Sequence, residues 1–281
     1  MRIGFIGAGR VGFTMGKYLK LHGEDITGYY SRNLEHAREA ADFTDTFFYN
    51  DVQKLIETSD AIILTVSDSA IKTVFDSIKT YPGIAEKTLC HTSGSMSSDV
   101  FDDSPFQVYG YSIHPIYAIS DKYASYKDFS NAFITIEGHE KHLDELESIF
   151  KSAGNKTGRL KSEDKSKYHA SCVMASNLVC GLYGAAIDLL SECNFDKETA
   201  NEMLISLFRD NALGIAEKGL IKQLTGPVDR NDVSTVKKHL EVMNEETKRL
   251  YIEASKYALN IAKVKNPDVD YTELNKLLQS L

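Results

Sequence analysis

A glycine-rich turn near the start of the chain has the residue types and the spacing of a phosphate-binding site. The apolar run Ile3–Ile6 leads directly into Gly7-Ala8-Gly9-Arg10-Val11-Gly12, which fits the pattern G-x-G-x-x-G, and an amphipathic stretch follows. In this context Gly7 permits the tight turn, Gly9 lets the backbone approach a pyrophosphate, and Gly12 lets helix and strand pack closely. The free N–H groups at the helix start then bind the anion. The alternative is a plain glycine turn at a strand–helix junction.

The end of the second apolar run predicts which dinucleotide binds. A site for NAD usually offers a carboxylate about 20 residues beyond the glycine turn, for the ribose hydroxyls. Here the run ends in Ser31-Arg32-Asn33 without a carboxylate. Because a guanidinium binds phosphate through a bidentate fork, Arg32 with its two neighbours favours the 2′-phosphate of NADP. The alternative is that Arg32 only solvates a loop.

The fourth apolar run ends in Thr65-Val66-Ser67, which we expect to pass beside the ribose of the cofactor. The next residue, Asp68, precedes an amphipathic stretch. We expect its side chain to cap that helix.

Two polar segments follow later apolar runs and are candidates for the chemistry. Ser93, in Cys90-His91-Thr92-Ser93-Gly94-Ser95, is predicted to orient a carboxylate or carbonyl substrate. His114, in Tyr111-Ser112-Ile113-His114-Pro115, is predicted to be the acid/base, because a histidine can take the proton of a substrate hydroxyl as hydride leaves carbon. Pro115 restricts the backbone of His114 and so fixes its direction. The alternatives are a polar turn and a structural histidine, and neither segment has the ligand spacing of a zinc site.

The elements that must position these residues alternate along the first part of the chain. Short apolar runs are separated by amphipathic stretches, which is typical of a parallel sheet with crossover helices. After about residue 160 the pattern becomes helical, in Lys165–Glu192, Lys197–Lys218, Ser234–Asn260 and Tyr271–Leu281. We therefore predict an α/β fold in two domains. Residues 1–160 form a dinucleotide-binding domain with a mostly parallel sheet, and residues 161–281 form an all-helical domain.

The segment Lys165–Glu192 is apolar nearly all round at its centre, so most of its faces should be buried. Ordinary core packing and a homodimer interface explain this pattern equally well. Asn177 lies among its apolar residues and is expected to meet a buried partner or a ligand. We predict that Asn177 helps to orient the substrate.

Composition excludes several classes of protein. Among 281 residues, 40 acidic side chains exceed 32 basic ones, and the net charge of −8 argues against a nucleic-acid partner. No apolar run approaches the roughly 20 residues that span a bilayer, so we expect no membrane partner. The chain begins directly with a strand, which leaves no room for a targeting segment. Four cysteines without a C-x-x-C pair favour a reducing cytoplasm.

Several segments together resemble a known family. They are GFIGAGRVG, YYSRN, HTSGS, SIHP, YHASCVMASN and LTGPVDRND, and they resemble Rossmann-like proteins with a C-terminal helical domain of unknown function, DUF2520. The resemblance covers essentially the whole chain. It implies a Rossmann fold, an NADP oxidoreductase whose substrate is not established, and a helical domain that commonly dimerises. The N-terminal half is also similar to pyrroline-5-carboxylate reductases, ketopantoate reductases, β-hydroxyacid dehydrogenases and prephenate dehydrogenases.

The resemblance assigns one role and leaves another open. SIHPI resembles the prephenate dehydrogenase segment whose histidine contacts the substrate hydroxyl, which implies this role for His114. The β-hydroxyacid dehydrogenases and ketopantoate reductases pair a catalytic Lys with an Asn one helical turn later. If Asn177 matches that Asn, the Lys position is Val173, which has no amine. Either His114 or His169 then replaces the lysine, or the protein performs no hydride chemistry.

Two hypotheses follow. In the first, the protein is an NADP-dependent oxidoreductase that acts on a small, carboxylate-bearing hydroxy, oxo or imino substrate. In the second, it is a non-catalytic dimeric sensor that binds NADP(H) and reports the redox state.

Overall fold

The structure is a computed structural model that describes residues 1–280. Within it the chain forms two compact units, Met1–Val173 and the residues from Met174 onward. The sequence prediction divides the chain earlier, between residues 160 and 161. The difference is about the length of helix α6 (Lys165–Ala175), most of which belongs to the first unit.

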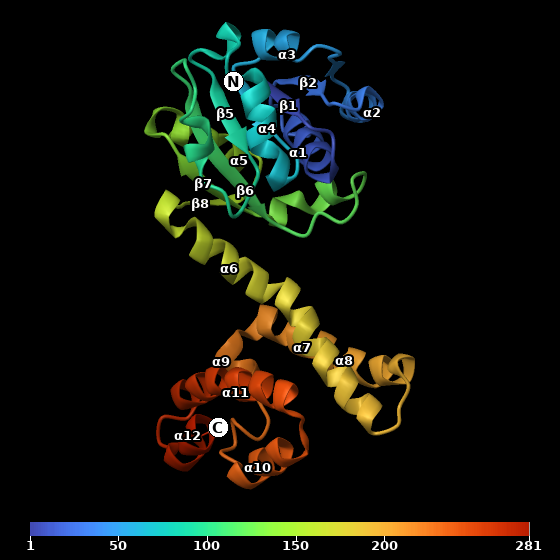
Figure 1. The fold of residues 1–281 in the computed structure, drawn as a ribbon, viewed down its shortest axis with the longest axis vertical. Coiled ribbons are helices and arrows are strands. Elements are labelled where there is room, and N and C mark those ends of the chain that lie inside the picture. Colours follow the sequence, from blue (N-terminus) through green and yellow to red (C-terminus); the bar gives the residue numbers. More distant parts are fainter. Residues whose placement is uncertain (281) are drawn as a thin grey trace. The chain divides into compact units, whose positions relative to one another are not determined.

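The first unit is built on a single eight-stranded sheet, drawn in blue to green in Figure 1. Its strand order is β3-β2-β1-β4-β5-β6-β7-β8, so the order reverses between β1 and β4. All pairs are parallel except β6 with β7. The strands are β1 (Ile3–Ile6), β2 (Ile26–Tyr30), β3 (Phe47–Phe48), β4 (Ala61–Leu64), β5 (Thr88–His91), β6 (Tyr109–Ile116), β7 (Phe133–Gly138) and β8 (Lys156–Arg159). The predicted mostly parallel Rossmann-type sheet is confirmed.

Helices cover both faces of this sheet because successive strand residues point to opposite sides. Phe5 and Ile63 pack with α1 (Arg10–Leu21), α2 (Leu34–Thr44) and α5 (Leu143–Ser152). Ile6 and Ile62 pack on the other face with α3 (Val52–Thr58) and α4 (Asp68–Ile78). Short 3-10 turns at Pro82–Ile84, Ser98–Phe101, Ser125–Asn131, Glu140–His142 and Ser162–Asp164 complete the unit. The sheet thereby forms a rigid frame whose carboxyl edge carries the candidate site.

Strand β6 is longer than the sequence predicts. The apolar pattern ends at Ile113, but the strand continues through Pro115 to Ile116. Its partner β5 ends opposite Ser112, so the last part of β6 pairs with β7 alone. A proline, which cannot donate a ladder hydrogen bond, is tolerated there because one side of the strand is open. His114 therefore lies on a strand that projects beyond the carboxyl end of β5.

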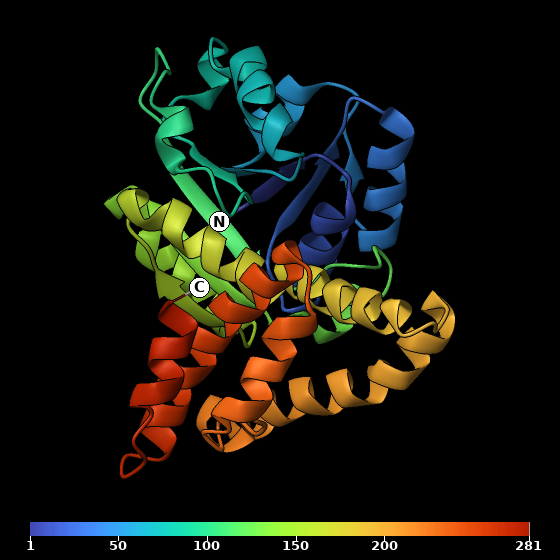
Figure 2. The same cartoon turned by 60° about the horizontal axis from the view of Figure 1, so that its bottom comes forward.

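The second unit consists of helices, shown in yellow through orange to red in Figure 2. They are α7 (Asn177–Glu192), α8 (Lys197–Lys218), α9 (Leu220–Gln223), α10 (Val233–Val242), α11 (Glu245–Lys265) and α12 (Thr272–Gln279). Val236, Leu259 and Leu274 lie in its apolar core. The prediction of one helix over Ser234–Asn260 is wrong, because the helix is interrupted at Met243. Asn244 then caps α11 by accepting from the amides of Glu246 and Thr247.

Helix α7 differs most from its sequence prediction. None of its residues is buried, although core packing was one of the two explanations for its apolar pattern. The other helices of its own unit therefore leave α7 uncovered, because an apolar pattern does not show what covers it. The continuous stretch Ser162–Glu192 is also long and apolar enough, by length and composition, to cross a membrane. The expectation that no run approaches that length is therefore wrong. Ser176 and Asn177 interrupt the apolar pattern, but the segment that contains them is apolar on average.

Candidate functional site

The glycine turn between β1 and α1 is held by the neighbouring end of β4. Gly7 has φ +110°, and a Cβ there would lie 2.7 Å from the carbonyl oxygen of Thr65. A Cβ at Gly12 would lie 2.6 Å from the Thr65 Oγ1 atom and 2.7 Å from the Gly7 carbonyl oxygen. The Thr65 hydroxyl donates to that carbonyl over 2.8 Å. The protein itself therefore requires glycine at positions 7 and 12.

Gly9 differs from its two neighbours and provides a test of whether the turn fits a pyrophosphate. Nothing in the protein approaches a Cβ at this position more closely than 4.0 Å. Gly9 is also the N-cap residue of α1, and no side chain caps its helix N-terminus. A glycine that the protein does not need, beside uncapped N–H groups, suits the close approach of a phosphate. The residues present therefore fit the predicted cofactor.

A cavity of about 710 Å³ extends from this turn across the ends of β2 and β4. Of the predicted cofactor residues, it is lined by Gly7, Ala8, Gly9, Ser31, Arg32, Asn33, Thr65, Val66 and Ser67. Arg10, Val11 and Gly12 lie in the first turn of α1 behind it. Asn33 accepts a hydrogen bond from the Glu35 amide and so caps α2. None of the described residues that line the cavity is acidic, and Arg32 is exposed in its wall, which suits a 2′-phosphate.

The expectation that Asp68 caps helix α4 is wrong. Ser67 is the N-cap residue, and it makes no side-chain capping bond. The Asp68 carboxylate instead accepts hydrogen bonds from the hydroxyls of Ser93 and Ser95, over 2.7 and 3.1 Å. It thus ties α4 to the loop after β5, because two hydroxyl donors outcompete a local cap. The sequence separation of 25 residues hides this pairing.

His114 lies in a hydrogen-bonded chain at the carboxyl edge of the sheet. Its Nδ1 atom is 2.5 Å from the hydroxyl of Tyr168 on α6, and Thr135 on β7 donates to that hydroxyl over 2.8 Å. Burial, with smaller effects of the neighbouring Lys165 and His169, lowers the pKa of His114 to about 4. The imidazole is therefore neutral at pH 7.

Lys165, in the first turn of α6, places an amine in the same cluster. The side chain is buried, and its Nζ atom donates to the Ser112 hydroxyl over 2.6 Å and to the Ser93 carbonyl over 3.1 Å. Burial lowers its pKa to about 8, against the opposing effect of Glu137 and Asp68. A lysine with a pKa near neutrality can exchange a proton at physiological pH.

Gly94 lets the two histidines of the cluster come close to the loop after β5. A Cβ at this position would lie 2.8 Å from the Nε2 atom of His114 and 2.8 Å from the Cδ2 atom of His169. The two imidazole rings are 6.3 Å apart between centroids. A side chain at position 94 would push both rings aside, so the glycine leaves room for them beside the loop.

Sequence reasoning missed Lys165, Tyr168 and Thr135 as members of the site. Lys165 and Tyr168 are three residues apart and share a helix face, but a lysine in a first helical turn usually lies in solvent. Only the position of α6 against the ends of β5 and β6 turns that face inward. The missing amine at Val173 is therefore no sign that the cluster lacks a lysine.

Two predicted substrate-orienting residues have other surroundings. The Ser93 hydroxyl donates to Asp68 and lies within hydrogen-bond distance of the amides of Ser95 and Met96, so it stabilises its own loop. Asn177 belongs to the second unit, where it is exposed and accepts a hydrogen bond from Ser176. Their roles toward a substrate remain predictions.

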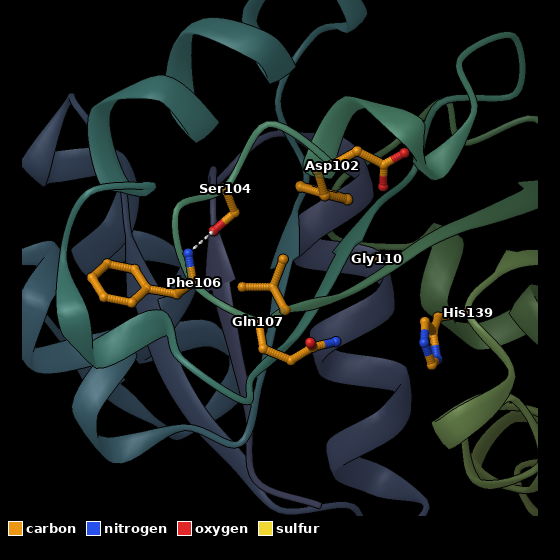
Figure 3. A pocket seen from close by; sticks show the side chains of 8 residues that line it. Asp102, Ser104, Phe106, Gln107, Gly110 and His139 are labelled. Atoms are coloured by element: carbon orange, nitrogen blue, oxygen red, sulfur yellow. Dashed lines mark hydrogen bonds between the residues drawn. The ribbon is translucent and has the colours of Figure 1, made fainter.

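A second cavity, of about 310 Å³, lies at the opposite, amino-terminal end of β6 (Figure 3). Asp102, Gln107 and His139 are among the residues in its wall. The Ser104 hydroxyl is engaged with the amide of Phe106, over 3.1 Å. In parallel sheets the ligand sites lie at the carboxyl ends of the strands, so we place the chemistry at the His114 cluster.

Two segments of the chain match known protein families. Residues 2–89 match the family NADP oxidoreductase coenzyme F420-dependent, and residues 132–258 match a domain of unknown function, DUF2520. Among curated proteins, none has a significantly similar sequence.

Solved structures share the fold over nearly the whole chain. A protein from Thermotoga maritima is 26% identical, with a TM-score of 0.73, over 94% of this chain and 99% of its own. A pyrroline-5-carboxylate reductase from Coxiella burnetii is 18% identical, with a TM-score of 0.58, over 94% and 97%. A reductive aminase from Aspergillus terreus, in complex with NADPH and ethyl-5-oxohexanoate, is 13% identical, with a TM-score of 0.59, over 99% and 92%. The last two comparisons concern the fold alone.

The family resemblance that the sequence motifs carry is thereby confirmed. NADP as the cofactor is confirmed by the family that the glycine turn and the strands around it match. The chain thus matches the family NADP oxidoreductase coenzyme F420-dependent over its N-terminal part and DUF2520 over residues 132–258.

Proposed function

We propose that this protein is an NADP-dependent reductase that transfers a hydride to or from a small, carboxylate-bearing hydroxy, oxo or imino compound. One observation carries the proposal. A buried amine with a pKa near 8, that of Lys165, and a neutral imidazole, that of His114, meet at the sheet edge of a domain that binds NADP. Hydride transfer to a polar double bond needs a proton donor beside the carbon that is reduced, and this cluster supplies one.

The two side chains divide the work. NADPH, when bound, supplies the hydride. Lys165 is protonated at pH 7 and donates a proton from Nζ to the oxygen or nitrogen of the reduced bond, which leaves a neutral amine. His114, which the sequence predicts as the acid/base, stays neutral and hydrogen-bonds the substrate. In the reverse direction the neutral Lys165 takes the proton of the substrate hydroxyl or amine.

A carboxylate on the substrate is supported by the charge of this cluster. Lys165 is a buried cation whose third N–H is not used by Ser112 or Ser93. An anionic group beside it offsets the cost of its burial. Ser93, Asn177 and the edge of His114 are the remaining candidates for orienting the substrate.

Absorbance of NADPH, followed with a panel of 2-oxo acids, 3-oxo acids and cyclic imino acids, tests the proposal. We expect at least one class to consume NADPH, and we expect His114→Ala to slow that reaction. The proposal fails if no class is turned over while calorimetry shows NADPH bound. That result favours the redox sensor. The sensor hypothesis rested on the missing amine at Val173, and the buried amine of Lys165 removes that ground.

We also propose that the protein works in the cytoplasm as a homodimer formed through its helical unit. Leu178 and Leu182 on α7 and Leu207 on α8 are about half exposed or more. Exposed apolar side chains that lie together mark an interaction surface. A second copy of the chain supplies the burial that the apolar pattern of α7 requires.

A further inference from the structure

The hydrogen bonds around His114 determine which of its ring nitrogens carries the proton. The Thr135 hydroxyl is 2.8 Å from the Tyr168 hydroxyl and 3.3 Å from the His114 carbonyl oxygen. Because Thr135 has a single hydroxyl proton, it donates that proton to the nearer acceptor, Tyr168. The Tyr168 hydroxyl accepts this hydrogen bond and can donate one further hydrogen bond with its own proton. Its hydroxyl has two further neighbours, the Cys172 thiol and the His114 Nδ1 atom at 2.5 Å, and the ring nitrogen is the stronger acceptor of the two. Tyr168 therefore donates to Nδ1, and a neutral imidazole that accepts at Nδ1 carries its proton on Nε2.

The surroundings keep both partners in these protonation states. Burial raises the pKa of Tyr168 to about 12, so the hydroxyl retains its proton. The charged and titratable groups that affect His114 are Lys165 and His169 on α6, Asp68 on α4 and His91 on β5, and together with burial they keep its pKa near 4. No described residue hydrogen-bonds Nε2, and Gly94 has no side chain to fill the space beside it. The Nε2–H group is thus a donor that the protein leaves unused.

We infer that His114 binds the substrate as a fixed hydrogen-bond donor through Nε2–H, and that Tyr168 is the positioning residue that sets this tautomer. The inference deepens the proposed function and rests on it for the existence of a substrate. The substrate atom that meets His114 is then an acceptor, a carbonyl or carboxylate oxygen. A protonated imine or amine nitrogen is excluded from this contact, because two donors would face each other. Proton transfer falls to Lys165, since a neutral Nε2–H group is a very weak acid.

The tautomer can be measured without any turnover. Nitrogen-15 NMR of the histidine-labelled full chain at pH 7, with the His114 signals assigned from the spectrum of His114→Gln, reports each ring nitrogen. We expect Nδ1 to have the shift of an unprotonated acceptor and Nε2 that of a protonated nitrogen. A protonated Nδ1 in the wild-type protein would overturn the inference, because the hydrogen bonds would then run in the opposite direction.

The role of Tyr168 is tested by its conservative variant. Tyr168→Phe removes the donor to Nδ1, and we expect His114 signals averaged between the two tautomers. Tyr81→Phe is the matched control, since its hydroxyl bonds Glu57 on the surface of the same unit and the variant should leave His114 unchanged. Unchanged His114 signals in Tyr168→Phe contradict a positioning role.

Activity then separates a hydrogen-bond donor from an acid/base. The amide nitrogen of glutamine can replace Nε2 as a donor, whereas glutamate can only accept at pH 7. A hydrogen bond of about 1.4 kcal/mol corresponds to a tenfold change in rate. We therefore expect kcat/KM of His114→Gln to stay within about tenfold of the wild-type value. We expect kcat/KM of His114→Glu to fall by more than tenfold. Equal losses in the two variants contradict the donor role. Absence of turnover in the wild-type protein contradicts the proposed function instead, and leaves the NMR result to decide the tautomer.

Discussion

Lys165 is the residue on which the proposed proton transfer depends, and its lowered pKa makes a pH prediction. The ammonium form, needed for reduction, persists below about pH 8 and is lost above it. We expect kcat/KM for reduction to be level below pH 8 and to fall above it. The rate of the reverse oxidation should rise through the same pH, because it needs the neutral amine. Steady-state rates across this range provide the measurement.

Lys165→Met tests whether the predicted change in rate near pH 8, the break in the pH profile, arises from the titration of Lys165. We expect kcat to fall by about 10²–10⁴, the usual contribution of a general acid, with the Kd for NADPH unchanged. Lys167→Met is the control, because Lys167 lies two residues away with its side chain 88% exposed. A profile in Lys165→Met that keeps the break near pH 8 would assign the break to another group.

Arg32 is the single cation that both the sequence and the cavity wall offer to a 2′-phosphate among the described lining residues. Hydrogen bonds to charged groups contribute about 1.5–3 kcal/mol, so Arg32→Ala should raise the Kd for NADPH by roughly ten- to a hundredfold. The Kd for NADH should not change. Arg38→Ala is the control, since Arg38 on α2 lies over the Phe48 ring and outside the cavity wall. Calorimetric titration with NADPH and with NADH measures both Kd values. Equal weakening of the two would show that Arg32 does not bind the 2′-phosphate.

Single residues show how far the sequence could predict the site. The glycine turn and Ser31–Asn33 were predictable because local spacing alone defines them. His114 was placed correctly at the carboxyl edge, since it follows an apolar strand. Lys165 and the Asp68–Ser93 contact were not predictable, because they join residues 25 to 72 positions apart. Such pairings depend on how α6 and α4 meet the sheet, and no local pattern carries that information.

The strand–turn–helix element from β1 to α1 makes the next prediction, which contrasts two of its glycines. Gly12→Ala brings a methyl group against Thr65 and the Gly7 carbonyl, so the free energy of unfolding should fall by about 1–3 kcal/mol. Gly9→Ala meets open space, so stability should change by less than about 0.5 kcal/mol. NADPH binding should nonetheless weaken in Gly9→Ala, because the methyl group occupies the path of the pyrophosphate. Denaturant unfolding and calorimetry measure the two effects, and a stable Gly9→Ala that binds NADPH normally contradicts the assignment.

The boundaries of the elements show where local patterns lose their power. Strands β1 and β2 begin and end where the apolar runs do, because their burial is set by neighbouring helices. The break between α10 and α11 was missed because Asn244, a strong N-cap, lies inside a continuous amphipathic pattern. Strand β6 extends past its apolar run because β7 pairs with residues that β5 does not reach. Pairing partners and caps, rather than hydrophobic periodicity, decide these ends.

For the molecule as a whole, the net charge of −8 opposes the binding of a polyanionic cofactor at long range. Binding must therefore rest on local groups, which here are the N-terminus of α1 and Arg32. The same separation of local and global charge applies to the substrate, for which Lys165 is a buried cation. An excess of acidic side chains favours solubility in general and says nothing about the chemistry of the site.

The surface of the α7–α8 hairpin makes the last prediction, which concerns assembly. Leu182 is 50% exposed and Leu207 69%, and burying such side chains stabilises association by about 1.5–3 kcal/mol each. We expect the wild-type protein to sediment as a dimer and Leu182→Glu to raise the dimer dissociation constant at least about tenfold, because a carboxylate would be buried at the interface. Val242→Glu is the control, since Val242 is 75% exposed at the end of α10 and outside this hairpin. A wild-type monomer that co-sediments with lipid vesicles would show that the apolar stretch meets a bilayer instead, and a dimer that Leu182→Glu leaves intact would place the interface on another face.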